Sequence, residues 1–230
     1  MQEENIQQII ETLQADINLN LATPAALEEL ARKTQRIHFD KGEYIFRTGD
    51  ELNSFFLVEN GLVILSKEAP SGKSFTYLVA VRGVPLNAIA CFGSQLRFFS
   101  ARVVKPADII TMPSSEFKKW VLKNPNVAAG ILNSMSDLIE GAYTRILDLI
   151  DESAEKRILN ALSMLSSRIG LDLPLTNGDV AEMVGTSRET AARIVSRLQD
   201  SGLISKSRGI VRILDKSQLD QFSSSPFFIL

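Results

Sequence analysis

The chain has 230 residues, of which 45% are hydrophobic and 23% charged, with a formal net charge of -2. This length suits one large domain or two smaller ones, and the composition is that of an ordinary globular protein. The net charge argues against a uniformly basic surface that coats nucleic acid. The single cysteine, Cys91, excludes an intrachain disulfide and favours a reducing compartment. Because no apolar run is long enough for a membrane span and the start at Met1 is unlike a signal peptide, we expect a cytoplasmic protein without a membrane partner.

The first half of the chain changes from a helical to a strand pattern. Residues 5–33 show helical spacing, and Thr23-Pro24 has the form of a helix start. From about Ile37 to Pro113, glycines recur every 7 to 12 residues between short apolar runs. Asn60-Gly61 lies between two such runs and predicts a hairpin. Strands at this spacing predict a sandwich or barrel-like roll, which could enclose a ligand or be packed throughout.

A long helix is expected from Asn124-Pro125 to about Asp151. Apolar residues recur along it at intervals of three or four, as in a coiled-coil seam between two chains. The residues expected at a dimer interface are Ile131, Met135, Leu138, Ala142, Ile146 and Leu149. The alternative is a helix that packs only on its own domain. Further apolar residues widen the seam, so that one side could meet a partner while the other covers the roll: Leu132, Ile139 and Ile150.

The last third predicts a winged helix-turn-helix. A helix over 153–169 is followed by two short helices on either side of Gly185, and Thr176 with Asp179 has the spacing of a capping box. Two short strands around Arg208-Gly209 then form a β-wing. From residue 187 to 212 the chain carries six Lys or Arg and two acids, a local charge of +4. A small basic face of this kind suits site-specific DNA binding.

The second short helix carries side chains suited to reading DNA. Arginine can bridge guanine O6 and N7, and glutamate can accept from cytosine N4, which fits Arg188, Glu189 and Arg193. Thr186 and Arg197 are better placed for phosphates. The expected DNA contacts are Thr186, Ser187, Arg188, Glu189, Thr190, Arg193 and Arg197. The alternative is a surface helical hairpin whose charges are only solvated.

The segment from Gly185 to Arg193, with residues 198–204 after it, resembles the recognition segment of the Crp/Fnr family of bacterial transcription regulators. The order of the upstream elements is similar to that family as well. The resemblance implies an α+β fold. Its parts would be a double-stranded β-roll sensor domain, a cupin-like jelly roll, over 1–123, a dimerisation helix over 124–152 and a winged helix-turn-helix over 153–230.

The family resemblance also implies a function. It implies a homodimer that binds and bends double-stranded DNA at a two-fold-related site and contacts RNA polymerase. Arg188, Glu189 and Arg193 match the base-contacting positions of the cyclic-AMP receptor branch, whereas the Fnr branch has a different residue at the position of Arg188. We therefore expect a TGTGA-like half-site. The signal would be received at the roll.

The sensor region departs from the cyclic-nucleotide cassette of the resembling family. That cassette has a Gly-Glu pair and, about ten residues later, Arg-Ser. Here Val84 or Pro85 replaces the acid, and Phe99 stands where the arginine should be. Because burying a cyclic phosphate nearly unpaired costs several kcal/mol, cyclic AMP is not expected, although Arg102 could substitute. The residues expected to line an effector pocket are Gly83, Leu86, Asn87, Phe99, Ser100, Arg102 and Tyr143.

Other cofactors are constrained by the small number of ligand side chains. An iron-sulfur cluster needs about four cysteines, so one cysteine excludes it. Haem remains an alternative, in a nitric-oxide-sensing regulator of the same family, with His38 and Cys91 as the candidate ligands. Cys91 also fits a small core residue in its apolar surroundings. A small organic effector, or no ligand at all, makes up the remaining possibilities, and no metal site is expected.

Two other classes of protein can be compared with the regulator. With one histidine, no paired carboxylates and no glycine-rich phosphate loop, no catalytic site can be assembled, so we do not expect an enzyme. A cupin-like ligand-binding or protein-interaction module without DNA binding is the second class. The apolar segment 227–230 is expected to dock on the same protomer or on a partner.

Overall fold

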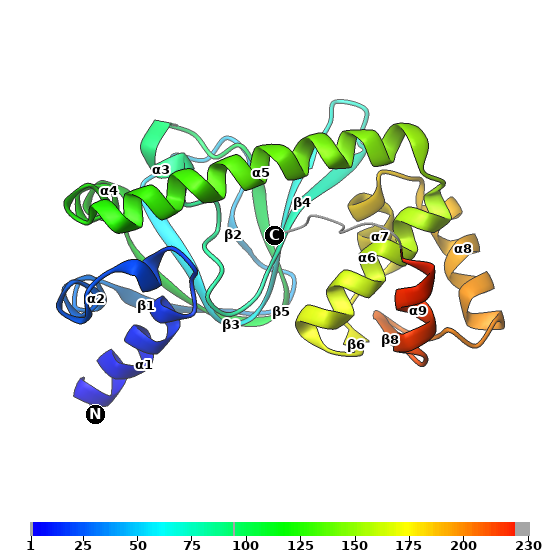
Figure 1. Cartoon of the computed structure of the whole chain (residues 1–230), viewed down its shortest axis with the longest axis horizontal. Helices are drawn as coiled ribbons and strands as arrows, with labels where there is room; N and C mark the ends of the chain where they lie inside the picture. Colours follow the sequence, from blue (N-terminus) through cyan, green and yellow to red (C-terminus); the bar gives the residue numbers. More distant parts are fainter. Residues whose placement is uncertain (1, 94, 224–230) are drawn as a thin grey trace. The chain divides into compact units, whose positions relative to one another are not determined.

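The computed structural model describes residues 2–93 and 95–223 (Figure 1). The apolar segment 227–230 lies outside the described residues. The chain divides into two compact units: unit 1 contains residues 1–65 and 78–139, and unit 2 contains residues 66–77 and 140–230. The long helix is shared between the two units, and so is the hairpin whose tip is 66–77. The expected division into three consecutive parts stays a prediction.

The helices of unit 1 precede, interrupt and follow its strands in the sequence. They are α1 (Gln2–Gln14), a 3-10 turn (Leu19–Leu21), α2 (Pro24–Ala31), α3 (Ala90–Gly93), α4 (Ser114–Lys123) and the first half of α5 (Pro125–Asp151). Thr23 caps α2 as expected, because its side chain accepts a hydrogen bond from the Ala26 N–H at 3.3 Å and Pro24 follows at the first helical position.

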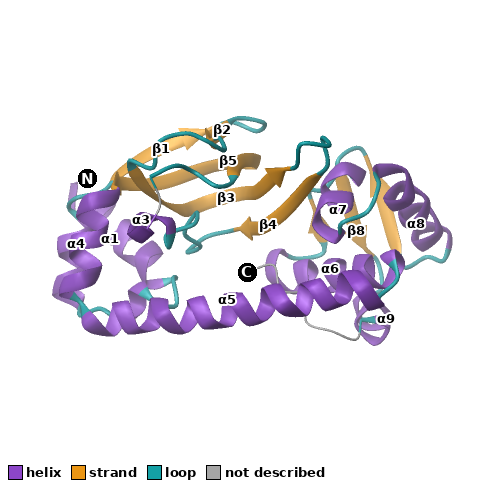
Figure 2. Ribbon diagram, turned by 90° about the horizontal axis from the view of Figure 1, so that it is seen from above, coloured by secondary structure: helices purple, strands orange, loops and turns teal. Residues whose placement is uncertain are grey.

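The strands of unit 1 belong to one sheet with the order β1-β5-β3-β4, and β2 also pairs with β5 (Figure 2). Their bounds are β1 (Gln35–Phe39), β2 (Tyr44–Phe46), β3 (Ser54–Glu68), β4 (Ser74–Ala80) and β5 (Ser100–Pro113). β1 runs antiparallel to β5, with Gln35 opposite Thr111 and Phe39 opposite Ala107. Beyond Leu65 and before Leu78, β3 and β4 enter the hairpin tip that belongs to unit 2.

The hairpin predicted at Asn60-Gly61 is wrong, because β3 runs through this pair without a turn. Gly61 has φ +95°, and a Cβ there would lie 2.4 Å from the carbonyl oxygen of Pro106 and 2.6 Å from Ala107. The backbone of the neighbouring strand β5 therefore occupies the space of a side chain. Because glycine has no side chain, it permits this close approach of two strands.

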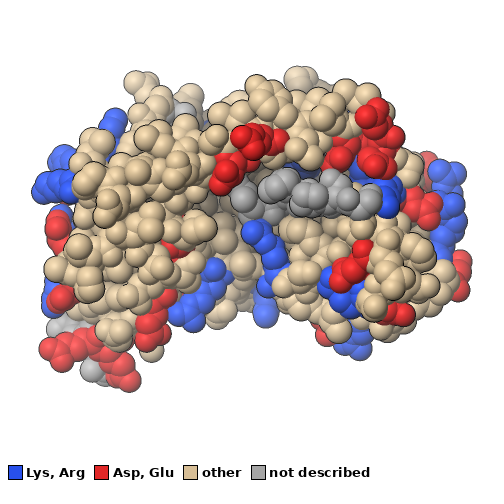
Figure 3. All heavy atoms as spheres, in the orientation of Figure 1, with Lys and Arg blue, Asp and Glu red and all other residues tan. Residues whose placement is uncertain are grey.

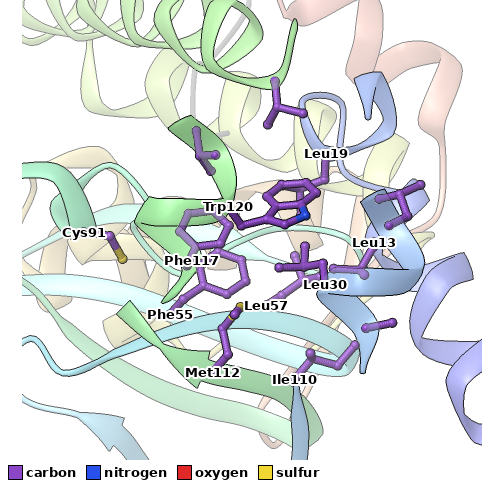
Figure 4. Packing of buried hydrophobic residues seen from close by; sticks show 14 of the residues in the cluster. Leu13, Leu19, Leu30, Phe55, Leu57, Cys91, Ile110, Met112, Phe117 and Trp120 are labelled. Carbon is purple, nitrogen blue, oxygen red and sulfur yellow. The ribbon is translucent and has the colours of Figure 1, made fainter. Parts of the chain in front are cut away.

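The core of unit 1 is centred on stacked aromatic rings (Figure 4). The centroids of Phe55 and Phe117 lie 3.8 Å apart, and Trp120 stacks beside Phe117. The indole Nε1 of Trp120 donates to the carbonyl of Ala26 at 2.9 Å, which satisfies its only polar atom. Ile131, from the first half of α5, is buried in the same cluster. The core thus joins α2, α4 and α5 to the sheet.

Unit 2 is a winged helix-turn-helix preceded by the second half of α5. Its elements are α6 (Ala154–Ile169), β6 (Asp172–Leu173), α7 (Asn177–Val184), α8 (Arg188–Asp200), β7 (Ile204–Ser207), β8 (Ile210–Ile213) and α9 (Lys216–Phe222). β7 and β8 pair on either side of Arg208-Gly209, which confirms the predicted wing. The α+β fold is thereby confirmed. Within residues 2–93 and 95–223, no helix combines the length and apolar character needed to cross a membrane.

Candidate nucleic-acid interface

The first helix of the helix-turn-helix, α7, is fixed at both ends by its own sequence. The Thr176 side chain accepts from the Asp179 N–H at 3.2 Å, and the Asp179 carboxylate accepts from the Thr176 N–H at 2.8 Å. The predicted capping box is therefore confirmed. At the other end Gly185 has φ +66° and its N–H donates to the Ala181 carbonyl. This left-handed residue makes the turn between the two helices.

The second helix, α8, presents the predicted reading side chains to solvent. Ser187 caps it by accepting from the Thr190 N–H at 3.0 Å. Its buried face consists of Ala191, Ile194, Val195 and Leu198. Arg188, Glu189, Arg193 and Arg197 are exposed around the rest of the helix, and beside its start Ser187 is exposed and Thr186 and Thr190 are half-exposed. The amphipathic spacing thus leaves the charged groups in reach of a DNA groove.

The wing adds a cation that the predicted contact set omitted. Burial lowers the pKa of Lys206 on β7, and the positive charge of Arg188 lowers it further. The Nζ of Lys206 donates to the Asn177 side chain. Lys206 therefore lies close enough to Arg188 for their positive charges to interact. The excess of positive charge over residues 187–212 was the sequence signal for Lys206. Figure 3 shows basic side chains, with a few acids beside them, over the position of α8.

Arg197 is also exposed on α8, but it already has a partner. Its Nη2 lies 2.7 Å from the Glu155 carboxylate at the start of α6. Both side chains are largely exposed, so this ion pair contributes little to stability. A phosphate at this position would compete with Glu155 for the guanidinium. The phosphate contact predicted for Arg197 stays a prediction.

Two buried arginines at the end of α7 were not found by sequence reasoning. Arg157 of α6 donates to the Val184 carbonyl at 2.8 Å and to the Glu152 carbonyl at 2.5 Å. Arg145 of α5 donates to the Met183 carbonyl. Burial lowers the pKa of Arg145 to about 10, so this side chain stays charged at neutral pH. Both arginines satisfy carbonyls that a helix end leaves unpaired.

The exposed apolar stripe of α5 differs from the predicted dimer set. Ile131 is buried in the core of unit 1, and Met135 packs against it, so neither belongs to the stripe. Leu138 is half-buried, Ala142 and Ile146 are exposed, and Leu149 lies beside Gly185. Leu147 and Leu149 are exposed as well, and the residues that share one stripe at intervals of three, four and seven are Leu132, Ile139, Tyr143, Ile146 and Ile150. Ile146 belongs to both sets, and the predicted dimer interface stays a prediction.

The residues expected to line an effector pocket are distributed over loops and strands. Gly83 is buried, and a Cβ there would lie 2.6 Å from the Ala15 side chain. Leu86 is buried, Asn87 has φ +60°, and the Phe98 and Phe99 rings meet edge to face. Three further members are placed as follows: Ser100 accepts from the Thr48 N–H, Arg102 lies opposite Tyr44 in the sheet, and Tyr143 is exposed on α5 in unit 2. The pocket stays a prediction.

Arg97 is the most unusual polar residue of unit 1, and sequence reasoning missed it. It is 3% exposed, and its guanidinium carbon lies 4.2 Å from the ring centroid of Phe46 and 5.1 Å from that of Phe56. One nitrogen donates to the Ser54 carbonyl, whereas Nε and Nη1 have no hydrogen-bond partner among the described residues. Burial lowers its pKa. The only sequence signal was an arginine in the apolar run 96–99.

The two candidate haem ligands have other surroundings. His38 is exposed on β1, with Nδ1 2.7 Å from the Asp108 carboxylate, and this hydrogen bond raises its pKa. Cys91 is buried, and burial raises the pKa of its thiol to about 11. A buried thiol and a surface histidine paired with a carboxylate give no support to the haem alternative. In the part of the chain that the structure describes, no three His, Cys, Asp or Glu residues are grouped to hold a metal.

A β-rich domain, a long helix and a winged helix-turn-helix with exposed basic residues define a two-part DNA-binding regulator. Residues 36–124 match the model of the cyclic nucleotide-binding domain, and residues 156–222 match that of the Crp-like helix-turn-helix domain. The chain belongs to the Crp/Fnr family of transcription regulators, whose members bind DNA and typically act as dimers.

Individual relatives match over most of the chain. The CRP-like cAMP-activated global transcriptional regulator of Mycobacterium tuberculosis is 22% identical over 204 residues, covering 85% of this chain and 91% of the relative. The anaerobic regulatory protein of Bacillus subtilis is 23% identical over 188 residues, covering 78% of each. The structure of CLP, the c-di-GMP-responsive global regulator of Xanthomonas campestris, has a TM-score of 0.72 at 18% identity, covering 84% of this chain and all of that one. This last likeness concerns the fold.

Proposed function

We propose that the protein is a homodimeric transcription regulator that reads a TGTGA-like palindromic site in double-stranded DNA in response to a signal at the β-roll. The observation that carries this proposal is the exposed face of α8. There Arg188, Glu189 and Arg193 project together from a helix whose start is fixed by the Ser187 cap. The cytoplasm is the compartment that suits such a regulator, with RNA polymerase as its further partner and with no catalytic activity.

The chemistry of the α8 face supports base reading. A guanidinium can bond O6 and N7 of one guanine, and a carboxylate can accept from the cytosine amino group. Arg188 and Glu189 lie in the first turn, where a recognition helix meets base edges. Arg197 and Lys206 flank them as candidates for phosphate contacts.

Dimerisation is supported by the exposed apolar stripe of α5. Ile139 is 51% exposed and Ile150 is 73% exposed, although both are aliphatic. The stripe repeats at intervals of three, four and seven residues, as required for helices that pair in a coiled coil. A parallel pair of α5 helices would relate two copies of α8 by a two-fold axis, which would match the two halves of a palindrome.

The input at the roll is proposed to be an effector other than cyclic AMP. Phe99 lies where the family places the phosphate-binding arginine, and Gly83 has Ala15 packed against it. Among the expected pocket residues only Arg102, which lies opposite Tyr44 in the sheet, carries a charge that could offset a phosphate. We include no haem, metal or iron-sulfur cluster in this proposal.

The experiment is a fluorescence-anisotropy titration of the full chain on a TGTGA palindrome and on a scrambled duplex, at two salt concentrations. We expect preference for the palindrome and weaker binding at higher salt. Arg188→Ala should weaken binding by about 1 to 3 kcal/mol and relax one guanine position. Arg168→Ala, an exposed arginine on α6, is the matched control and should leave base preference unchanged. Equal affinity of wild type and Arg188→Ala would contradict the assignment, and absence of binding would favour an interaction module.

A further inference from the structure

Arg145 joins three segments of unit 2 that are far apart in the sequence. It lies on α5, and its Nη1 donates to the Thr76 carbonyl at 2.8 Å in the hairpin tip. Its Nη2 donates to the Met183 carbonyl in the last turn of α7. Its guanidinium carbon lies 4.0 Å from the ring centroid of Phe75, in the same hairpin tip. One side chain thus binds both the hairpin tip and the end of the first helix of the helix-turn-helix.

The geometry of these contacts requires the planar, branched head group of arginine. The two carbonyls belong to different segments and are reached by two different nitrogens of one guanidinium, while its face covers the Phe75 ring. A lysine ammonium is a compact charge without the fork and without a flat face. Arg145 is buried, so losing a carbonyl partner leaves a polar group unsatisfied rather than hydrated.

The Met183 carbonyl is close to the residues that orient α8. It is followed by Val184, by the left-handed Gly185 and then by the turn that leads to the Ser187 cap. Leu149, one turn further along α5 than Arg145, lies beside Gly185. A shift of Arg145 therefore moves the turn from which the reading side chains begin.

We propose that Arg145 is a positioning residue for α8, and that it makes the orientation of this helix depend on the hairpin tip 66–77. The proposal deepens the DNA-reading function proposed above and rests on it. The hairpin tip is continuous with β3 and β4, whose other parts belong to unit 1. The hairpin is thus a second covalent route, besides α5, from the β-rich domain into the DNA-reading unit.

Arg157 provides the matched control, because it performs the same capping without the hairpin. It donates to the neighbouring carbonyl, that of Val184, and to two carbonyls near the end of α5, those of Asp148 and Glu152. It is buried to a similar degree as Arg145. Both arginines hold the end of α7, and Arg145 in addition contacts Phe75 and Thr76.

The test is a double-mutant cycle on the full chain. Phe75→Leu, Arg145→Lys and Arg157→Lys are made singly, and Phe75→Leu is combined with each arginine variant. DNA affinity is measured on the TGTGA palindrome, and amide hydrogen exchange is measured over residues 183–190 without DNA. We expect Phe75→Leu to weaken DNA binding about threefold to tenfold and to speed exchange in 183–190. This effect should be lost in the Arg145→Lys background and kept in the Arg157→Lys background.

The two readouts separate the possible failures. If the wild type does not prefer the palindrome, the proposed function fails, while the exchange data still decide whether Arg145 orients the turn. If Phe75→Leu changes neither exchange nor affinity in a folded chain, the positioning role is wrong. If its effect is equal in both arginine backgrounds, Phe75 acts through general stability and the coupling through Arg145 is wrong. Should Arg145→Lys fail to fold, the distribution of exchange in Phe75→Leu decides: faster exchange confined to residues 183–190 supports the coupling, and an equal increase over α6 and α8 overturns it.

Discussion

The Cδ2 atom of Leu149 lies 2.8 Å from the position that a Cβ on Gly185 would occupy. A side chain of α5 therefore packs against the tight turn of the helix-turn-helix. Glycine is favoured at this turn by its φ of +66°, and the contact with the end of the Leu149 side chain adds a smaller constraint, because that methyl group can shift.

The left-handed conformation alone costs alanine about 1 to 2 kcal/mol. Gly185→Ala should lower the free energy of unfolding by more than this, because the new Cβ also displaces the Leu149 side chain. Gly209→Ala is the matched control, because Gly209 has φ +76° with open space around its Cβ position. Urea unfolding of both variants measures the difference. Leu149→Ala in the Gly185→Ala background should recover part of the extra loss. Equal costs at the two glycines would show that the Leu149 contact is unimportant.

Ile139→Asp should convert a dimer into a monomer, because it places a charge in the middle of the exposed stripe. We expect the dissociation constant of the dimer to rise at least tenfold, as measured by sedimentation velocity over a dilution series. Affinity for the palindrome should fall with it. Leu122→Asp on α4 is the control, since Leu122 is 66% exposed and lies outside the stripe. A similar shift for both variants would place the interface elsewhere.

His38 should make stability depend on pH in a defined direction. The hydrogen bond to Asp108 raises the pKa of His38 in the folded state, so protonation favours folding. This contribution is present below the unfolded pKa of about 6.5 and is lost as the pH rises through the raised, folded value. The stability difference between wild type and His38→Gln should therefore shrink as pH increases. His38 is the sole histidine of the sequence, so its ring signal in NMR gives its pKa directly. A value below 6.5 would contradict the prediction.

Cys91 should be unreactive in the native protein. With a pKa raised to about 11 by burial, about 0.1% of the thiol is thiolate at pH 8. Alkylation by iodoacetamide at pH 8, followed by mass spectrometry, should be at least tenfold slower in buffer than in urea, where the thiol is exposed and ionises more readily. The urea sample is also the control for reagent activity. Equal rates would show that the site opens freely.

Local sequence signals predicted the helix-turn-helix well because its determinants are local. The Thr176 cap, its Asp179 partner and the turn glycine Gly185 lie within ten residues, and the structure confirms all three. The exposed position of Arg188 followed from the same helical spacing. Each of these features depends on backbone geometry that neighbouring residues determine by themselves.

Signals that depended on distant segments were misread or missed. Asn60-Gly61 has the form of a hairpin, yet the glycine serves the approach of β5, some 45 residues further along the chain. Arg145 and Arg97 carry charges inside apolar patterns. The partners of Arg145 lie 38 to 70 residues away in the sequence, and those of Arg97 lie 41 to 51 residues away. Periodicity along α5 could not decide which of two apolar faces covers the roll.

The two apolar faces of α5 have a consequence for regulation. A monomer would keep large aliphatic groups in water along most of this helix, which disfavours the separated state and invites aggregation. Regulation of DNA binding by dissociation of the dimer into monomers would therefore carry a large cost in free energy for this chain. We expect two protomers to remain together whether or not a signal is present, and the signal to alter the spacing and tilt of the two reading helices instead.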